Sequence, residues 1–135
     1  MDRAMEIIRD AKRIAVVGVS SRPDRPSNEV AQYLIDHGYE VYLVNPAESE
    51  IFGRPVYASV RDLPVPVDIV DIFRRPGDVP PVVDDAIAAG AKVVWMQLEI
   101  VNDEAAATAR AAGLEVVMDR CTKIEHMRLR GEAHP

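Results

Sequence analysis

A loop of serines and arginines follows the first apolar run of the chain. The run RIAVVG ends at Gly18, and the next residues include Ser20, Ser21, Arg22 and Arg25. Hydroxyl and guanidinium groups donate hydrogen bonds to phosphate oxygens, and arginine can form two parallel bonds. A helix that starts after such a loop adds free backbone N–H groups and a favourable dipole. The loop is therefore a candidate site for phosphate groups.

This loop matches neither of two common nucleotide-binding motifs. The dinucleotide motif G-x-G-x-x-G needs more glycines and an acidic residue about 20 positions later, but Gly18 is followed by serines and prolines, and the second strand ends at Asn45. A Walker A motif is absent. These departures disfavour NAD and ATP and favour a larger polyanion. Alternatively, Arg22 and Arg25 are ordinary solvated loop residues.

Two further segments carry groups suited to a nucleotide. In FRRPGD (73–78), Phe73 can flank a base or be an ordinary core residue, and Arg74 can contact a phosphate or a carboxylate. Arg75 is expected on the surface. Cys121, in MDRCTKIEH, is either a buried, unreactive thiol or a thiol that faces the ligand.

The sequence contains no pattern typical of a catalytic or metal site. His37 stands before Gly38 at the end of a predicted helix, where a cation stabilises the helix dipole. His126 and His134 lie in a charged C-terminal segment, and no H-E-x-x-H, CxxC or acidic metal-binding loop occurs. We therefore expect neither catalysis nor a bound metal.

The composition is typical of one soluble globular domain. The chain has 135 residues, of which 48% are hydrophobic and 28% are charged. Its formal net charge of −6 disfavours nonspecific nucleic-acid binding, which needs a basic surface. No apolar run is long enough to span a membrane, and no secretory signal is visible. We expect a cytoplasmic domain over 1–135 with neither a nucleic-acid nor a membrane partner.

The candidate residues lie on a chain that alternates short apolar runs with amphipathic segments. The runs predict β-strands at 13–18, 40–46, 67–73, 92–98 and 114–119, and a short strand near 55–57. The amphipathic segments predict helices at 3–11, 28–37, 79–89, 103–112 and about 121–129, with a helical turn around 59–62. Ser27 or Asn28 is expected to cap the second helix.

This order predicts an α/β fold in which a doubly wound, mainly parallel sheet carries helices on both faces. In such a sheet, ligands bind beyond the carboxyl ends of the strands, at the point where the strand order reverses. The segments expected around a ligand are 18–27, 45–48, 73–78, 96–99 and 119–123.

Five segments of the chain resemble, in order and spacing, the single-domain CoA-binding proteins of bacteria and archaea. They are IAVVGVSS, GYEVYLVNPAESEIFGRPVYASVRDLP, VDIVDIFRRP, VVWMQLEI and GLEVVMDRC. That family is similar to the CoA-binding domain of the succinyl-CoA synthetase alpha subunit. The resemblance implies a Rossmann-like domain that binds coenzyme A or an acyl-CoA.

The resemblance also implies roles for individual residues. The CoA phosphates would be held by Gly18, Val19, Ser20, Ser21 and Arg22. The adenosine end would be lined by Asn45 and Pro46, and the nucleotide and pantetheine path by Phe73, Arg74, Met96, Gln97 and Leu98. Arg25 and Cys121 complete the candidate set. CoA carries a pyrophosphate and a 3′-phosphate, about four negative charges, which suits arginine and hydroxyl donors.

Two residues depart from the patterns of these relatives. The family usually has the sequence QLGI, but this chain has Glu99 in place of that glycine. Glu48 stands where the synthetase domain has a lysine. A carboxylate that points into a phosphate site would repel the ligand.

Three kinds of function follow from this resemblance and from the residues themselves. The synthetase uses a phosphorylated histidine on a further domain, and 135 residues leave no room for one. We therefore expect a binding module with no catalysis of its own. The alternatives are a subunit of an acyl-CoA synthetase-type ligase that needs a partner chain, and an NAD-linked redox enzyme or sensor. A further hypothesis is that Cys121 forms a mixed disulfide with the CoA thiol under oxidation.

Overall fold

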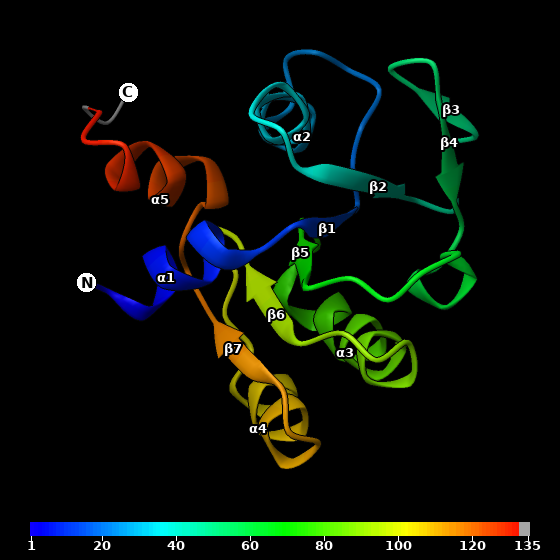
Figure 1. Ribbon diagram of the computed structural model, residues 1–135. Coiled ribbons are helices and arrows are strands. Elements are labelled where there is room, and N and C mark those ends of the chain that lie inside the picture. The colour runs from blue at the N-terminus through cyan, green and yellow to red at the C-terminus, as the bar shows by residue number, and fades with distance from the viewer. Residues whose placement is uncertain (133–135) are drawn as a thin grey trace.

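The computed structural model describes residues 1–132 of the chain. Within them, seven strands form one sheet in the order β3-β4-β2-β1-β5-β6-β7 (Figure 1). All neighbouring strands are parallel except β3 and β4, which form an antiparallel pair. The strands are β1 (Arg13–Val17), β2 (Glu40–Val44), β3 (Glu50–Ile51), β4 (Arg54–Tyr57), β5 (Ile69–Ile72), β6 (Val93–Met96) and β7 (Glu115–Val117).

Helices cover both faces of this sheet (Figure 1). One face carries α1 (Arg3–Asp10), α2 (Pro26–Asp36) and α5 (Thr122–Leu129), and the other carries α3 (Val79–Ala88) and α4 (Asp103–Ala111). Two 3-10 turns, η1 (Val60–Asp62) and η2 (Pro76–Asp78), lie in the connections. The expected doubly wound α/β fold is confirmed. Among residues 1–132, no helix is both long and apolar enough to cross a bilayer. His134 lies outside the described residues.

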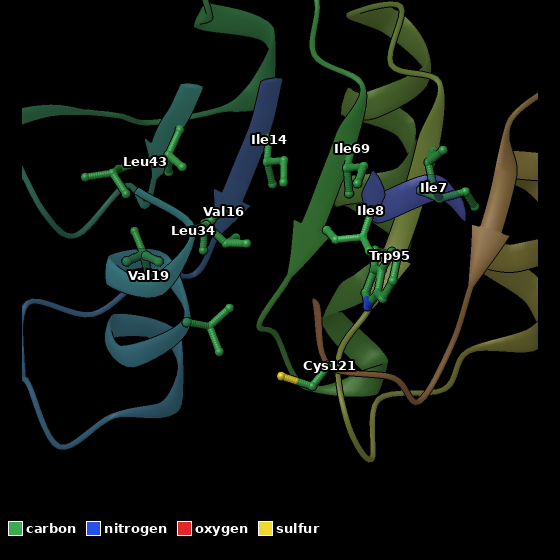
Figure 2. Close-up of a cluster of buried hydrophobic side chains, with 14 of the residues drawn as sticks. Ile7, Ile8, Ile14, Val16, Val19, Leu34, Leu43, Ile69, Trp95 and Cys121 are labelled. Atoms are coloured by element: carbon green, nitrogen blue, oxygen red, sulfur yellow. The ribbon is translucent and has the colours of Figure 1, made fainter. Parts of the chain in front are cut away.

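Each face of the sheet packs its own hydrophobic cluster. In β1, Ile14 and Val16 face the cluster under α1, α2 and α5, while Ala15 and Val17 face the cluster under α3 and α4. Figure 2 shows the first cluster, in which the fully buried Trp95 packs beside α1. Because the central strands are covered on both sides, they consist of nearly continuous apolar residues.

Two local features differ from the prediction. α2 begins at Pro26 with Arg25 as its N-cap, so Ser27 and Asn28 belong to the first turn and neither of them caps the helix. Proline suits this first position because its fixed φ is helical and its missing N–H would have no helical partner. The strand β3 was not predicted, because a run of two residues carries no readable alternation.

The strand order reverses at β1. After β2 the chain forms β3 and β4 on one side of β1, and then crosses to β5 on the other side. The loops that leave β1 and β5 therefore run toward helices on opposite faces, α2 and α3. Such a divergence opens a crevice at the carboxyl edge of the sheet.

Candidate functional site

A cavity of about 380 Å³ lies at this reversal point. The loops after β1, β2 and β5 and the first turn of α2 supply its walls: Gly18, Ser20, Arg25, Pro26, Ser27, Asn45, Ala47, Glu48 and Phe73. Five of these nine residues, namely Gly18, Ser20, Arg25, Asn45 and Phe73, are among the candidates from the sequence. The structure thus brings residues from three distant segments to one cavity.

The loop after β1 is braced by polar side chains of α2. The backbone N–H of Ser20 donates to Ser27 Oγ at 3.0 Å, and Asn28 Nδ2 donates to the carbonyl oxygen of Ser20 at 2.9 Å. The Ser20 hydroxyl oxygen accepts from the N–H of Arg22 at 3.1 Å. Ser27 and Asn28 are both buried. These bonds hold the loop against the first turn of α2.

Gly18 is required by a close approach between two loops. It has a φ of +86°, and a Cβ at this position would lie 2.1 Å from the carbonyl oxygen of Phe73. The N–H of Phe73 donates to the carbonyl oxygen of Val17 at 2.8 Å, which holds the two loops together. Only glycine satisfies both the conformation and the space.

The three candidate arginines have different surroundings. Arg25 lines the main cavity beside the N-terminus of α2 and makes no ion pair within residues 1–132. Arg22 is exposed and pairs with Asp24 at 3.2 Å. Arg74 lines a neighbouring cavity of about 160 Å³. Arg25 is therefore the guanidinium best placed to meet an anion in the main cavity.

Asn45 joins the loop after β2 to the loop after β1. Its Nδ2 donates to the carbonyl oxygen of Val19 at 2.9 Å, and its Oδ1 accepts from the N–H of Ala47 at 2.9 Å. Pro46 lies in the neighbouring cavity with Arg74. Asn45 thus lines the main cavity and also fixes its shape.

Phe73 contributes to both the cavity and the core. It is partly buried, it packs against the hydrophobic cluster under α1, α2 and α5, and its exposed side lines the main cavity. Phe73 is therefore partly a core residue, and its contact with a base stays a prediction. Arg75 is exposed, with its side chain 91% accessible, and pairs only with Asp78 within the described residues, as expected for a surface residue.

Other candidates from the sequence do not reach the cavity with their side chains. Val19 and Met96 are fully buried in the two core clusters. Leu98 is 51% exposed in the loop after β6, and Ser21 and Arg22 are exposed on the loop after β1. A hydrophobic residue at the end of a buried strand can either line a cavity or pack in the core. The sequence pattern is the same in both cases, so it could not distinguish them.

Gln97 belongs to a buried polar cluster beneath the carboxyl edge. Its Nε2 donates to Asp71 Oδ1 at 2.6 Å and lies 3.0 Å from Thr122 Oγ1, while that hydroxyl donates to Asp71 Oδ2 at 2.9 Å. Burial raises the pKa of Asp71 to about 7, and the hydrogen bonds from Gln97 and Thr122 lower it only in part. The cluster ties β5 to the loop after β6 and to the first residue of α5.

Cys121 is a buried thiol next to this cluster. It is the N-cap residue of α5 and is 7% exposed within the core cluster shown in Figure 2. Burial raises the pKa of Cys121, and the neighbouring charge of Asp71 raises it further. A buried thiol with a raised pKa is a poor nucleophile, so the geometry favours the unreactive alternative.

The two carboxylates that depart from the relatives have well-defined positions. Glu48 lines the cavity, and its Oε2 accepts from the N–H of Ser21 at 2.7 Å. Glu99 is exposed, has a φ of +66°, and donates its N–H to Asp119 Oδ1 at 2.7 Å. Glycine adopts this left-handed conformation more readily than glutamate does, which fits the glycine expected at position 99 from the resemblance. The bond between Glu48 and Ser21 joins loops distant in sequence, so no local pattern predicted it.

The histidines of the described residues lie away from this cavity. His37 ends α2, where its Nδ1 is 2.7 Å from the carbonyl oxygen of Tyr33, so the expected C-terminal position is confirmed. His126 Nδ1 is 2.7 Å from the hydroxyl of Tyr33. Within residues 1–132, no group of three or more His, Cys, Asp or Glu side chains is arranged to hold a metal ion.

Known proteins are similar to this chain in sequence, and solved structures are similar to it in fold. The chain is 41% identical over 121 residues to the uncharacterized protein YneT of Bacillus subtilis, and the aligned region covers 90% of each chain. It is 36% identical over 97 residues to the alpha subunit of an ADP-forming acetate–CoA ligase of Pyrococcus furiosus, spanning 67% of this chain but 21% of that protein. A solved structure of a hypothetical protein from Pyrococcus horikoshii has a TM-score of 0.92 and 46% identity, with 96% of this chain and 91% of that chain covered.

A family model agrees with these likenesses. The model described as a CoA binding domain matches residues 12–127, which include all strands of the sheet and the three loops that line the cavity. The chain therefore belongs to the CoA-binding domain family.

Proposed function

We propose that this domain binds coenzyme A or an acyl-CoA in the cavity at the carboxyl edge of the sheet. The observation that carries the proposal is the arrangement around the loop after β1, where Ser20, Arg25 and the first turn of α2 share one cavity. The positive end of the α2 dipole and the Arg25 guanidinium, which makes no ion pair within residues 1–132, suit a pyrophosphate. Phe73 supplies an apolar surface for the adenine ring.

The pantetheine arm would leave this cavity along the loops after β5 and β6. These strands are neighbours, so their carboxyl ends form a continuous edge from Phe73 to the exposed Leu98. Arg74, whose Cδ lies 3.4 Å from the position of a Cβ at Gly18, is close enough to this edge to meet a second phosphate. The residues present therefore fit the chemical groups of CoA.

We propose that the domain acts by binding and does not catalyse a reaction alone. Among residues 1–132, no cysteine or histidine lines the cavity, and Cys121 is buried with a raised pKa. Covalent catalysis needs an activated nucleophile beside a base. A ligand site of this kind suits delivery, storage or sensing of CoA.

A titration of the purified chain with CoA, acetyl-CoA and NAD tests this proposal. We expect saturable binding of CoA and acetyl-CoA and much weaker binding of NAD, because the loop lacks the glycines of the dinucleotide motif. Absence of CoA binding, or tighter binding of NAD, would overturn the proposal.

The likeness to an acetate–CoA ligase subunit supports a second candidate function. In that case the domain would supply CoA to catalytic residues of a partner chain. A partner that copurifies with the chain and forms a CoA thioester with it, when neither does so alone, would favour this alternative.

A further inference from the structure

The carboxylate of Glu48 lies in the main cavity and accepts a hydrogen bond from the backbone of the loop after β1. It reaches into the main cavity from the loop after β2, and its Oε2 accepts from the backbone N–H of Ser21 at 2.7 Å. Ser21 belongs to the loop between β1 and α2, where backbone N–H groups face an anion in nucleotide-binding folds. The protein's own anion therefore accepts a bond from this loop.

The other acidic side chains near the loop are engaged elsewhere. Asp24 pairs with Arg22 at 3.2 Å on the exposed side of the loop, and Glu29 pairs with Lys123 at 2.6 Å. Glu48 is the acidic residue in the cavity lining. It is partly buried, so water screens its charge less than it screens an exposed carboxylate.

A phosphate and this carboxylate exclude each other. One N–H cannot donate a full hydrogen bond to both anions, and two negative charges at contact distance repel. Arg25 does not neutralise Glu48, since no ion pair joins them within the described residues, although both line the cavity. A phosphate that accepts from the Ser21 N–H must therefore displace the Glu48 carboxylate from this bond.

We propose that Glu48 is an internal competitor that lowers the affinity of this site for phosphorylated ligands. The inference rests on the proposed function and deepens it, because it names the residue that sets how tightly CoA is held. A site weakened in this way releases CoA more readily than a site with a neutral or basic residue at position 48. The affinity then depends on the charge at this one position.

Glu48→Gln tests the competition most cleanly. Glutamine has nearly the same shape and its carbonyl oxygen can still accept from Ser21, so the loop keeps its brace while the charge is removed. We expect CoA to bind about tenfold more tightly to Glu48→Gln than to the wild type at low salt. A tenfold change in affinity is about the effect of one charge-assisted hydrogen bond. The difference should shrink at high salt, because screening weakens the repulsion.

Glu50→Gln is the matched control. Glu50 lies two residues along in β3, is exposed and is not part of the cavity lining, so this variant makes the same change of net charge outside the site. Its affinity for CoA should equal that of the wild type.

The outcomes separate this inference from the proposed function. If the wild type binds CoA and Glu48→Gln binds it equally or more weakly, Glu48 is only a brace and the inference is wrong. If Glu50→Gln tightens binding as much as Glu48→Gln does, net charge explains the effect and the inference is again wrong. If no variant binds CoA, the proposed function itself fails.

Discussion

The backbone of Gly18 lies directly against the carbonyl group of Phe73. A Cβ at Gly18 would approach the Phe73 oxygen to 2.1 Å and its carbonyl carbon to 3.0 Å. This contact joins the loops after β1 and β5 at the reversal point, so the main cavity depends on it. It also gives a sharp test of the site's construction.

We predict that Gly18→Ala destabilises the fold by more than about 3 kcal/mol, because the added methyl group meets rigid backbone and the residue has a positive φ. Chemical denaturation measures this loss. Gly38→Ala is the matched control: Gly38 has a φ of +90° but nothing within 4 Å of an added Cβ. It should cost only about 1–2 kcal/mol, the conformational penalty. Equal losses in the two variants would show that the close approach is unimportant.

Arg25→Ala should weaken CoA binding about tenfold or more, since it removes a charge-assisted contact inside the cavity. The salt dependence of binding should also fall, because one fewer positive charge meets the phosphates. Calorimetric titration at several salt concentrations measures both effects. Arg75→Ala, which removes a guanidinium that is 91% exposed and outside the cavity, should leave the affinity unchanged. A loss shared by both variants would point to a general effect of charge.

The buried carboxyl of Asp71 predicts an unusual dependence of stability on pH. Its pKa is about 7 in the folded protein and about 4 in an unfolded chain. Between these values the folded state holds the extra proton, so the free energy of unfolding falls as the pH rises, by up to about 1.4 kcal/mol per pH unit.

Asp71→Asn cannot titrate and should abolish this fall. Its amide oxygen can still accept from Gln97, and its Nδ2 can donate to Thr122 Oγ1 in place of the bond that the Thr122 hydroxyl donates to Asp71. We expect Asp71→Asn to gain stability relative to the wild type as the pH rises toward neutrality. Urea denaturation across a pH series measures the difference, with Asp84→Asn on the exposed side of α3 as the control for lost charge. Parallel curves for wild type and Asp71→Asn would contradict the assignment.

Glu99→Gly should stabilise the protein by about 1 kcal/mol. The residue has a φ of +66°, which glycine adopts without the penalty that a side chain incurs, although glycine also loses more entropy on folding. Thermal and chemical unfolding measure the gain. Glu99→Ala removes the same carboxylate but keeps the strain, so it should not stabilise the protein. A gain in Glu99→Ala as large as in Glu99→Gly would assign the effect to charge.

The fold could be predicted because the strands of the sheet and the helices that cover it each produce a recognisable local pattern in the sequence. The strands β1, β5 and β6 are buried on both faces, and Gly38, Gly90 and Gly113 follow the helices that precede β2, β6 and β7. Apolar runs and terminal glycines of this kind are readable in one sequence. The reversal of strand order then placed the candidate loops at one edge.

The details of the site depend on contacts between distant segments. Ser27 and Asn28 resemble helix caps in sequence, but Pro26 starts the helix earlier and both side chains brace the loop at Ser20. Glu48 meets Ser21 only because β2 pairs with β1. Similarly, Asp71 is an acidic residue in an apolar run, and its burial follows from partners at positions 97 and 122. These contacts join residues that are distant in sequence, so no periodic pattern in the sequence predicts them.

Backbone amide chemical shifts, recorded by NMR while CoA is added, test the central claim most directly. We predict that the largest changes fall on the loops after β1, β2 and β5, around Ser20, Arg25 and Phe73. We expect no change at the cavity on the opposite edge of the sheet, which is lined in part by Lys12 and His37. Unchanged spectra, or changes centred on that opposite edge, would contradict a CoA site at the carboxyl ends of the strands.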